Sequence, residues 1–354
     1  MWLFTNRLEG IGLCMKEKIV FILGAGFSNP TGAPLVDGFL KEARDIYFNE
    51  NEFLEQVEKD FFGKVFKYHG DLAKARTRTK FDIDNIEDFF SILDINIASS
   101  KKQSFKEIRR ALVYVIIKTL ERLIKEDGYA LYYNFVRDLC DLSDQYDYSF
   151  VTFNYDLILE RALENGSCLY NYCLHPDKFP IKSFQKKVLK LHGSSNWLIC
   201  NQCKKVMVLN HKALGNLYSS SCSSCKQEVI PLLIPPTWNK RFDSTFIENV
   251  WHFAFEELRQ ANRIIIIGYS LPPTDIYFRD FLTLCLKDSD PLRKIVVIDP
   301  NNSIKERYES FFEADFSRRY LNFIQRTFSE RSEGWGITAK EMIEGELDGS
   351  IDGY

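Results

Sequence analysis

The sequence has no apolar run long enough to cross a bilayer. Its apolar stretches, such as Ala111–Ile117 and Ile264–Ile267, fall far short of the roughly 20 residues that a transmembrane helix needs. The first residues, Met1–Phe4, are followed by Arg7 before the hydrophobic core of a signal peptide could form. We therefore expect a cytoplasmic protein that is neither exported nor inserted in a membrane.

The sequence also lacks a block of like charge. Its 46 basic and 49 acidic residues give a net charge of -3. Proteins that bind nucleic acid through its backbone carry a basic patch or stripe that neutralises phosphates. The near balance of charge argues against a nucleic-acid partner, even though the chain contains one candidate zinc ribbon.

The nine cysteines do not have the pattern of a disulfide framework. Four of them form two Cys-x-x-Cys pairs with the spacing of a zinc ribbon: Cys200, Cys203, Cys222 and Cys225. Four thiolates complete a tetrahedral Zn²⁺ and leave no open position, so these residues predict a structural zinc. The other five are scattered and typical of buried or incidental thiols in a reducing compartment: Cys14, Cys140, Cys168, Cys173 and Cys285.

Five short apolar runs each end in a polar or glycine-containing loop, which is typical of buried parallel strands. The runs are Lys18–Leu23, Tyr148–Phe153, Lys187–Leu191, Arg263–Ile267 and Lys294–Ile298. Helical patterns lie between them. The sequence therefore predicts an α/β fold with a Rossmann-like, mostly parallel sheet that is covered by helices on both faces.

Two insertions interrupt this expected sheet. The first is helical, clearest in Phe105–Lys125, and the second is a small zinc-ribbon module. A last amphipathic helix is expected at Arg307–Ile324, and a polar tail follows in which Trp335 and Ile337 are the only expected anchors. The predicted units are a Rossmann-like domain at 18–36, 146–199 and 228–325, a helical insertion at 37–145, a zinc-ribbon module at 200–227 and a C-terminal tail at 326–354.

The helical insertion is far longer than a strand connection requires. It contains many aromatic residues, among them Phe61, Phe62, Phe66, Tyr68, Phe89 and Phe90. Surplus apolar surface tends to be buried at an interface, so we expect this segment to mediate self-association or the docking of a partner. The alternative is that these rings pack within the same chain.

The candidate site residues follow the ends of the expected strands, where ligands of open α/β sheets bind. Asn154 and His192 can converge on one crevice there. In isolation, a histidine of this kind is more often structural, and an asparagine after a strand is often a helix cap. Asp156 can equally cap a helix that begins near Leu157.

The other candidates are suited to the phosphates and sugars of a nucleotide. The turn that contains Gly24, Ala25, Gly26 and Ser28 lets backbone amides approach a pyrophosphate, although it lacks the third glycine of the usual dinucleotide fingerprint. Gly268 and Ser270 offer donors to phosphate. Asp299 and Asn301 can hydrogen-bond a ribose. The alternative for Asp299 is a turn that ends the strand before Pro300.

As an ordered set, these motifs resemble the sirtuin superfamily, and more closely its divergent bacterial SIR2-like branch, several members of which act in defence against phage. The motifs are GAGFS followed by TGAP, TFNYD, LHG, the two cysteine pairs, IIIIGYS and VVIDPN, within Lys18–Asn301. The resemblance implies NAD bound between a Rossmann-like domain and a zinc-and-helix domain. It places the family's asparagine at Asn154, its histidine at His192 and its phosphate-binding turn at Gly24–Ser28, with later loops at Ser270 and Asn301.

Two departures separate the chain from protein-deacylating sirtuins. Those enzymes carry a Phe-Arg pair after the glycine turn, whereas Gly32–Pro34 runs here into Leu35–Asp37. Their Phe-Gly-Glu segment, which lines the acyl-lysine groove, is replaced by PLLIPPTW at Pro231–Trp238. SIR2-like defence proteins with this pattern generally hydrolyse NAD, some within large assemblies that contain a HerA-type ATPase.

The first hypothesis is therefore an NAD⁺ hydrolase that depletes NAD during defence, forms a homo-oligomer and has a structural zinc. His192 would act as general base on a ribose hydroxyl, because an imidazole ordinarily titrates near neutrality. Asn154 would orient water or the nicotinamide ribose. The rival hypotheses are a protein deacylase or ADP-ribosyltransferase that uses the same residues, and a catalytically silent sensor of NAD or ADP-ribose.

Overall fold

The main sheet has seven strands, and each pair of neighbouring strands is parallel. The computed structural model describes residues 16–74, 84–175, 180–182, 184–210, 220–234, 245–287, 289, 291–329 and 337–345. The strands are β1 (Glu17–Leu23), β2 (Tyr146–Thr152), β3 (Tyr170–Asn171), β4 (Lys186–Lys190), β8 (Arg263–Ile267), β9 (Lys294–Ile298) and β10 (Leu321–Ile324). Their order is β10-β9-β8-β1-β2-β4-β3.

This strand order is that of dinucleotide-binding sheets with one strand added. Without the edge strand β3 and read from the other side, the order is β4-β2-β1-β8-β9-β10. Numbered along the chain, this is the order 3-2-1-4-5-6 of dinucleotide-binding sheets. The connections change direction between β1 and β8, and ligands of such sheets bind outside the carboxyl ends of the strands at that point. The expected α/β fold with a Rossmann-like sheet is therefore confirmed.

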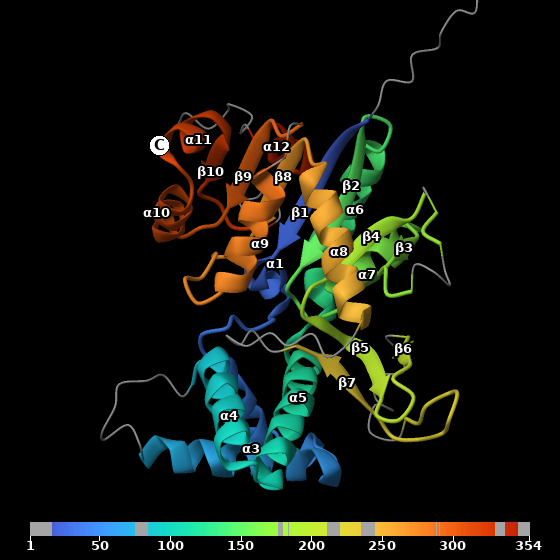
Figure 1. Ribbon diagram of the computed structural model, residues 1–354, viewed down its shortest axis with the longest axis vertical. Coiled ribbons are helices and arrows are strands. Elements are labelled where there is room, and N and C mark those ends of the chain that lie inside the picture. The colour runs from blue at the N-terminus through green and yellow to red at the C-terminus, as the bar shows by residue number, and fades with distance from the viewer. Residues whose placement is uncertain are drawn as a thin grey trace, which may run out of the picture.

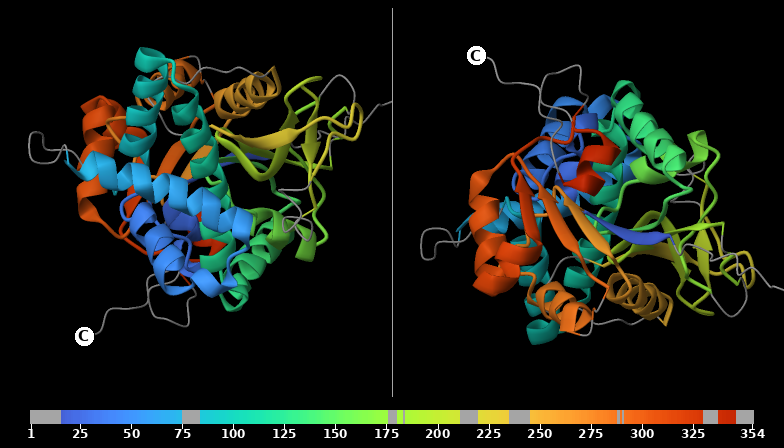
Figure 2. Two further views of the ribbon diagram at one scale, coloured as in Figure 1. Left: turned by 90° about the horizontal axis from the view of Figure 1, so that it is seen from below. Right: turned by 90° about the horizontal axis from the view of Figure 1, so that it is seen from above.

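Helices cover both faces of the main sheet, which explains why its central strands are apolar on both sides. On one face lie α8 (Thr245–Arg259) and α9 (Ile276–Lys287), which pack against each other (Figures 1 and 2). On the other lie α6 (Tyr129–Asp141), α7 (Ile158–Asn165) and α12 (Ala339–Glu344). All four consecutive isoleucines of β8 are at most 1 % exposed.

The prediction of one amphipathic helix at Arg307–Ile324 is wrong. The chain forms α10 (Asn302–Phe311), a break at Phe312, then α11 (Ala314–Tyr320) and the strand β10. The apolar residues of β10 pair with β9, and this gain outweighs the local helical pattern.

The tail also contains more structure than expected. A capping box at Thr338 and Glu341 begins α12, whose Met342 and Ile343 are buried in the main core. Ile337 is buried as expected, but it is not a sole anchor, and Trp335 lies outside the described residues.

Four helices form a second layer beyond the carboxyl ends of the main strands (Figure 1). They are α2 (Phe39–Asn49), α3 (Gln56–Ala73), α4 (Ile86–Ser100) and α5 (Gln103–Leu123). Phe62, Phe89 and Phe90 are buried among them, and Phe61 stacks on Tyr114 with ring centroids 4.6 Å apart. The six aromatic residues named in the sequence analysis all pack in this core. For them, the structure agrees with the alternative prediction that the rings pack within the same chain.

A small antiparallel sheet continues from the main one. It has the order β6-β5-β7, with β5 (Gly193–Cys200), β6 (Val206–Val208) and β7 (Val229–Leu233). Leu198, Val229 and Leu233 share the second core with α2–α5, whereas α6 packs in the main core. The described residues also contain four short elements: α1 (Ala25–Ser28), η1 (Asn29–Thr31), η2 (Asn51–Phe53) and η4 (Glu126–Gly128).

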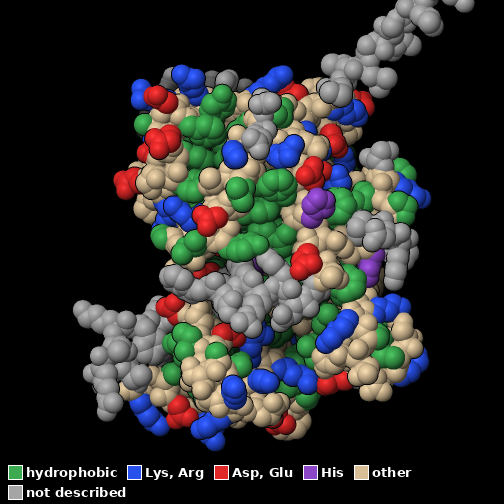
Figure 3. Space-filling view, viewed as in Figure 1, with side chains coloured by type: hydrophobic (Ala, Val, Ile, Leu, Met, Phe, Trp, Pro, Cys, Tyr) green, Lys and Arg blue, Asp and Glu red, His purple; other side chains and the backbone are tan. Residues whose placement is uncertain are grey.

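The face shown in Figure 3 has a concentration of exposed apolar side chains. Figure 3 shows hydrophobic side chains gathered over α8 and α9, where Ile276, Tyr277 and Leu284 are exposed. Among the helices that the structure describes, none combines the length and the hydropathy needed to cross a membrane.

Candidate functional site

A cavity of about 950 Å³, counted with its open mouth, lies at the carboxyl edge of the main sheet. Most of the residues expected from the sequence line it: Gly24, Ala25, Ser28, Asn154, Asp156, His192, Gly268 and Ser270. The loops after β1, β2, β4 and β8 thus meet in one place, at the change of direction between β1 and β8.

Glycines let the loops after β1 and β8 touch through their backbones. A Cβ on Gly24 would lie 2.5 Å from the carbonyl oxygen of Gly268, and one on Gly268, whose φ is +61°, would lie 2.5 Å from Cα of Gly26. The amide of Gly24 donates to the carbonyl of Ile267 at 3.0 Å, and that of Gly26 donates to the carbonyl of Gly268 at 3.0 Å. These two amides therefore join the loops, and Ala25 and Ser28 are the members of the turn that line the cavity with Gly24.

Asn154 is oriented by the glycine turn. Its Nδ2 donates to the carbonyl of Gly24 at 2.8 Å and to Oγ of Ser28 at 2.9 Å. Both bonds leave from the amide nitrogen, so Oδ1 is the atom of this side chain suited to accept a hydrogen bond from a ligand. The helix α7 begins only at Ile158, and its N-cap position is Leu157. The bonds of Asn154 thus position it at the cavity instead of capping that helix.

His192 lies next to two aromatic rings and is fixed along its backbone. Its ring meets Phe153 edge to face, with centroids 5.2 Å apart, and lies 6.3 Å from the ring of Tyr155. Its carbonyl accepts a hydrogen bond from the amide of Ile234 at 2.8 Å. The next residue, Gly193, has a φ of +81°, and a Cβ there would lie 2.1 Å from the carbonyl oxygen of Leu232. His192 thus lies in the turn after β4 of the main sheet, and Gly193 begins β5 of the small sheet.

Asp156 bonds the start of a helix, as one of its two predicted roles requires, and it lines the cavity as well. Its Oδ1 accepts a hydrogen bond from the amide of Ile158 at 3.1 Å, in the first turn of α7. Its backbone carbonyl accepts from Nζ of Lys190. Lys190 also pairs with Glu160 at 2.8 Å, and both side chains are almost fully buried, 1 % and 3 % exposed.

Sequence reasoning missed this buried ion pair and the far wall of the cavity. The wall comes from the helical second layer and is mostly apolar, with Val36, Phe39, Ile86, Phe90, Ile116 and Leu120. It also contains Glu87, whose Oε2 accepts a hydrogen bond from Oγ1 of Thr274 at 3.4 Å. Lys190, inside the apolar run of β4, indicates in the sequence that a buried partner of opposite charge is needed. No local sequence pattern predicts which residues form the far wall of the cavity.

Asp299 and Asn301 do not line the cavity. Oδ1 of Asp299 accepts from the amide of Asn301 at 2.9 Å, and Oδ1 of Asn301 caps α10 by accepting from the amide of Ser303 at 3.0 Å. Burial raises the pKa of the Asp299 carboxyl above its usual value. Asp299 thus forms the turn that was the alternative to binding a ribose, and Asn301 caps the helix that follows.

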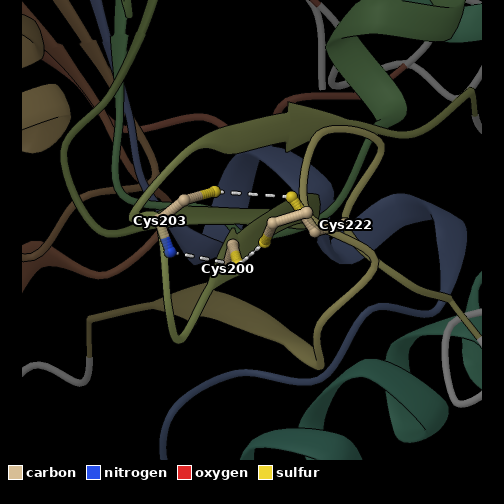
Figure 4. Close-up of side chains that lie close together, drawn as sticks. Cys200, Cys203 and Cys222 are labelled. Atoms are coloured by element: carbon tan, nitrogen blue, oxygen red, sulfur yellow. Dashed lines mark hydrogen bonds between the residues drawn. The ribbon is translucent and has the colours of Figure 1, made fainter.

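The four paired cysteines converge at the end of the small sheet (Figure 4). Sγ of Cys200 lies 3.4 Å from Sγ of Cys225, and Sγ of Cys203 lies 3.5 Å from Sγ of Cys222. A tetrahedral zinc with bonds of about 2.3 Å sets its sulfurs about 3.8 Å apart, so the four residues fit this ion. The amides of Cys225 and Ser224 lower the pKa of the Cys222 thiol to about 6, which favours the thiolate that a metal requires.

The turns that carry the cysteine pairs repeat each other. The amide of Lys204 donates to the carbonyl of Cys200 at 3.1 Å, and that of Lys226 donates to the carbonyl of Cys222 at 2.9 Å. Both lysines have a left-handed backbone, with φ of 58° and 60°. The two Cys-x-x-Cys segments therefore form matching turns that face each other.

Comparison with known proteins gives one family match. Residues 148–320 match the model of the SIR2-like domain. No curated protein sequence matches the chain.

Solved structures of sirtuins are similar over nearly the whole chain, at low identity. Sir2Tm bound to a propionylated peptide is 15% identical, with 94% of each chain covered and a TM-score of 0.43. A Sir2 protein with a p53 peptide and NAD⁺ is 17% identical, with the same coverage and a TM-score of 0.44. A Sir2 homologue in complex with ADP-ribose is 14% identical, covers 94% of this chain and 96% of its own, and has a TM-score of 0.45. The SIR2-like match covers just under half of the 354 residues, and it includes both Asn154 and His192.

Proposed function

We propose that the chain hydrolyses NAD⁺ to nicotinamide and ADP-ribose in the cavity at the carboxyl edge of the main sheet. The observation that carries the proposal is the meeting of Asn154, His192 and the glycine turn in that cavity. It lies where sheets of this strand order bind dinucleotides. The SIR2-like match covers both residues.

The proposed reaction breaks the bond between nicotinamide and its ribose. Nicotinamide leaves with the bonding electron pair, water adds to the anomeric carbon, and a proton is released. His192 acts as general base on a ribose hydroxyl, and Oδ1 of Asn154 accepts a hydrogen bond from the ribose or from the attacking water. Since Gly24 and Ser28 already orient the amide of Asn154, this acceptor is positioned before substrate binds.

Ala25, Ser28, Gly268 and Ser270 are proposed to contact the phosphates, and Asp156 the nicotinamide end. Asp299 and Asn301 already accept hydrogen bonds from the backbone of their own turn and helix. Their contact with a ribose is therefore a secondary part of the proposal. Zn²⁺, held by Cys200, Cys203, Cys222 and Cys225, would be structural, because four thiolates fill its coordination sphere.

The biological role follows from the resemblance to SIR2-like defence proteins. We propose a cytoplasmic effector that depletes NAD during anti-phage defence and works as a homo-oligomer, in some settings with a HerA-type ATPase. Control by assembly would keep such an enzyme from exhausting NAD in an uninfected cell.

Incubation of the purified protein with NAD⁺, with and without an acetyl-lysine peptide, tests the reaction. Nicotinamide and ADP-ribose formed without peptide support hydrolysis. Nicotinamide formed only with peptide, together with acetyl-ADP-ribose, would replace hydrolysis by deacylation. Tight binding of NAD⁺ without turnover would identify a sensor and contradict the proposal.

A further inference from the structure

A second pair of cysteines lies away from both the cavity and the four-cysteine cluster. Sγ of Cys140 is 2.7 Å from Sγ of Cys168. The closest sulfurs of the four-cysteine cluster are farther apart, at 3.4 Å and 3.5 Å. A disulfide bond is about 2.05 Å long, so a small displacement would bring Cys140 and Cys168 into bonding distance.

The pair joins two elements at the amino edge of the main sheet. Cys140 lies in the last turn of α6, and Cys168 lies between α7 and β3. The amide of Lys186, at the start of β4, donates to the carbonyl of Leu169, beside Cys168. The proposed NAD⁺ cavity lies at the opposite ends of these strands.

Both thiols are open to small oxidants. Cys140 and Cys168 are partly exposed and line one surface groove with Lys16 and Lys186. By contrast, Cys173 and Cys285 are buried, and burial raises the pKa of each of these thiols to about 12. Outside the four-cysteine cluster, the described residues thus include two accessible, adjacent thiols and two buried ones that serve as internal references.

We propose that Cys140 and Cys168 form a reversible disulfide, with a peroxide as oxidant and a dithiol as reductant. One thiol attacks the O–O bond of hydrogen peroxide and becomes a sulfenic acid, with release of one water. The other thiol then attacks that sulfur, the S–S bond forms, and a second water leaves. Two electrons pass from the thiols to the peroxide, and a dithiol returns both electrons and both protons.

The thiols stay reduced until an oxidant is present. Burial, followed by the neighbouring Cys140, raises the pKa of the Cys168 thiol to about 11, and Lys186 only partly opposes this. Little thiolate therefore exists at Cys168 at neutral pH, which slows the reaction with weak oxidants. The disulfide would fasten α6 to the segment after α7. Tyr132 of α6 donates to the carbonyl of Phe27 at 2.6 Å, so the fastened helix also supports the glycine turn.

Peptide mapping of the full-length, zinc-loaded protein tests the proposal. The protein is treated with hydrogen peroxide, free thiols are blocked with iodoacetamide, and unreduced peptides are analysed by mass spectrometry. We expect a cross-link between the Cys140 and Cys168 peptides that disappears with dithiothreitol, while Cys173 and Cys285 are alkylated only after unfolding. The melting temperature should rise by several degrees in the oxidised wild type but not in Cys168→Ser.

The controls separate this pair from general oxidation. In Cys168→Ser, Cys140 should be recovered alkylated or as a sulfenic acid, without a link to another cysteine. Cys285→Ser should cross-link as the wild type does. Full alkylation of Cys140 and Cys168 after peroxide treatment, or links to the other cysteines at equal yield, would overturn the proposal. Neither outcome depends on NAD⁺ turnover.

Discussion

Lys190 shows how a single residue next to the cavity can serve stability. Its ammonium group is buried against Glu160 and the carbonyl of Asp156, and Tyr172 donates to the same oxygen of Glu160 at 3.0 Å. A buried charge that loses its partner is costly, because neither water nor protein then solvates it. The ion pair thus fixes β4 to the loop that carries Asp156.

We predict that Lys190→Met lowers the free energy of unfolding by about 3–5 kcal/mol, because it leaves Glu160 buried without its cation. Lys190→Met combined with Glu160→Leu should recover much of this loss. Denaturant titration measures both. The matched control is Lys305→Met, because Lys305 pairs with Glu309 on the surface and its loss should cost less than about 1 kcal/mol. If Lys190→Met loses no more unfolding free energy than the control does, the stabilising role of the buried ion pair is refuted.

The candidate site could be predicted from the sequence only where local motifs carry it. Asn154 and His192 follow recognisable strands, and the structure brings both to the cavity. Asp299 and Asn301 follow a strand in the same way, yet they form a turn and a helix cap. The same residue types suit both tasks, and only the position of the neighbouring loops distinguishes them.

At the scale of elements, Glu257 fastens a helix to two strands. It lies on α8 and pairs with Lys187 of β4 at 2.5 Å and with Lys18 of β1 at 3.2 Å. Its side chain is only 5 % exposed. Burial alone would raise the pKa of Glu257, but the hydrogen bond from Lys187 and the charges of both lysines bring it below its usual 4.5.

We predict that Glu257→Gln lowers stability by about 1.5–3 kcal/mol at pH 7, since it removes hydrogen bonds to a charged group. A carboxyl with a lowered folded-state pKa stabilises the protein above its unfolded pKa and loses that effect as pH falls through the folded value. The difference between wild type and variant should therefore be constant above about pH 5 and shrink below pH 4.5. Thermal melts across pH 3–8 measure it, and a difference that grows at low pH would contradict the assignment.

The two facing cysteine turns predict one zinc per chain. Replacement of Cys203 by serine should release the metal and destabilise the small sheet, because metal binding contributes to the folding of such modules. Elemental analysis of protein purified without chelator gives the zinc content. Cys285→Ser, away from the cluster, should keep a full equivalent. Wild-type protein that is folded but holds no zinc would contradict the prediction.

The sequence predicts elements well where a strand is buried on both faces. The five expected strands agree with β1, β2, β4, β8 and β9 to within two residues at each end. It fails for β10 and the small sheet, because these strands acquire their conformation from the neighbours with which they pair. Pairing partners far apart in sequence leave no local signal.

At the scale of the whole molecule, the helical second layer completes the cavity. Its apolar residues face the loops of the main sheet, and Glu87 reaches Thr274 across the two layers. The expectation that its aromatic residues form a docking surface loses its support, since those named from the sequence pack internally. The exposed apolar residues of this layer are others, among them Phe48, Phe53 and Ile95.

We still predict self-association through this layer, because the proposed hydrolysis of NAD⁺ would require control in the cell. Light scattering over a concentration series should give a mass above the 41.4 kDa of one chain. Ile95→Ser should shift the distribution towards monomer, whereas Leu284→Ser, on α9, should not. A strictly monomeric protein with full activity would remove the reason for invoking assembly.

NAD⁺ turnover by His192→Ala, measured with release of nicotinamide and ADP-ribose, tests the central claim most directly. Loss of a general base commonly lowers the rate by about 10²–10⁴-fold, and we predict a loss of this size in a variant that remains folded and keeps its zinc. The matched control is His252→Ala, because His252 is an exposed histidine of α8 and should leave turnover unchanged. Turnover by His192→Ala equal to that of wild type and control would contradict the account.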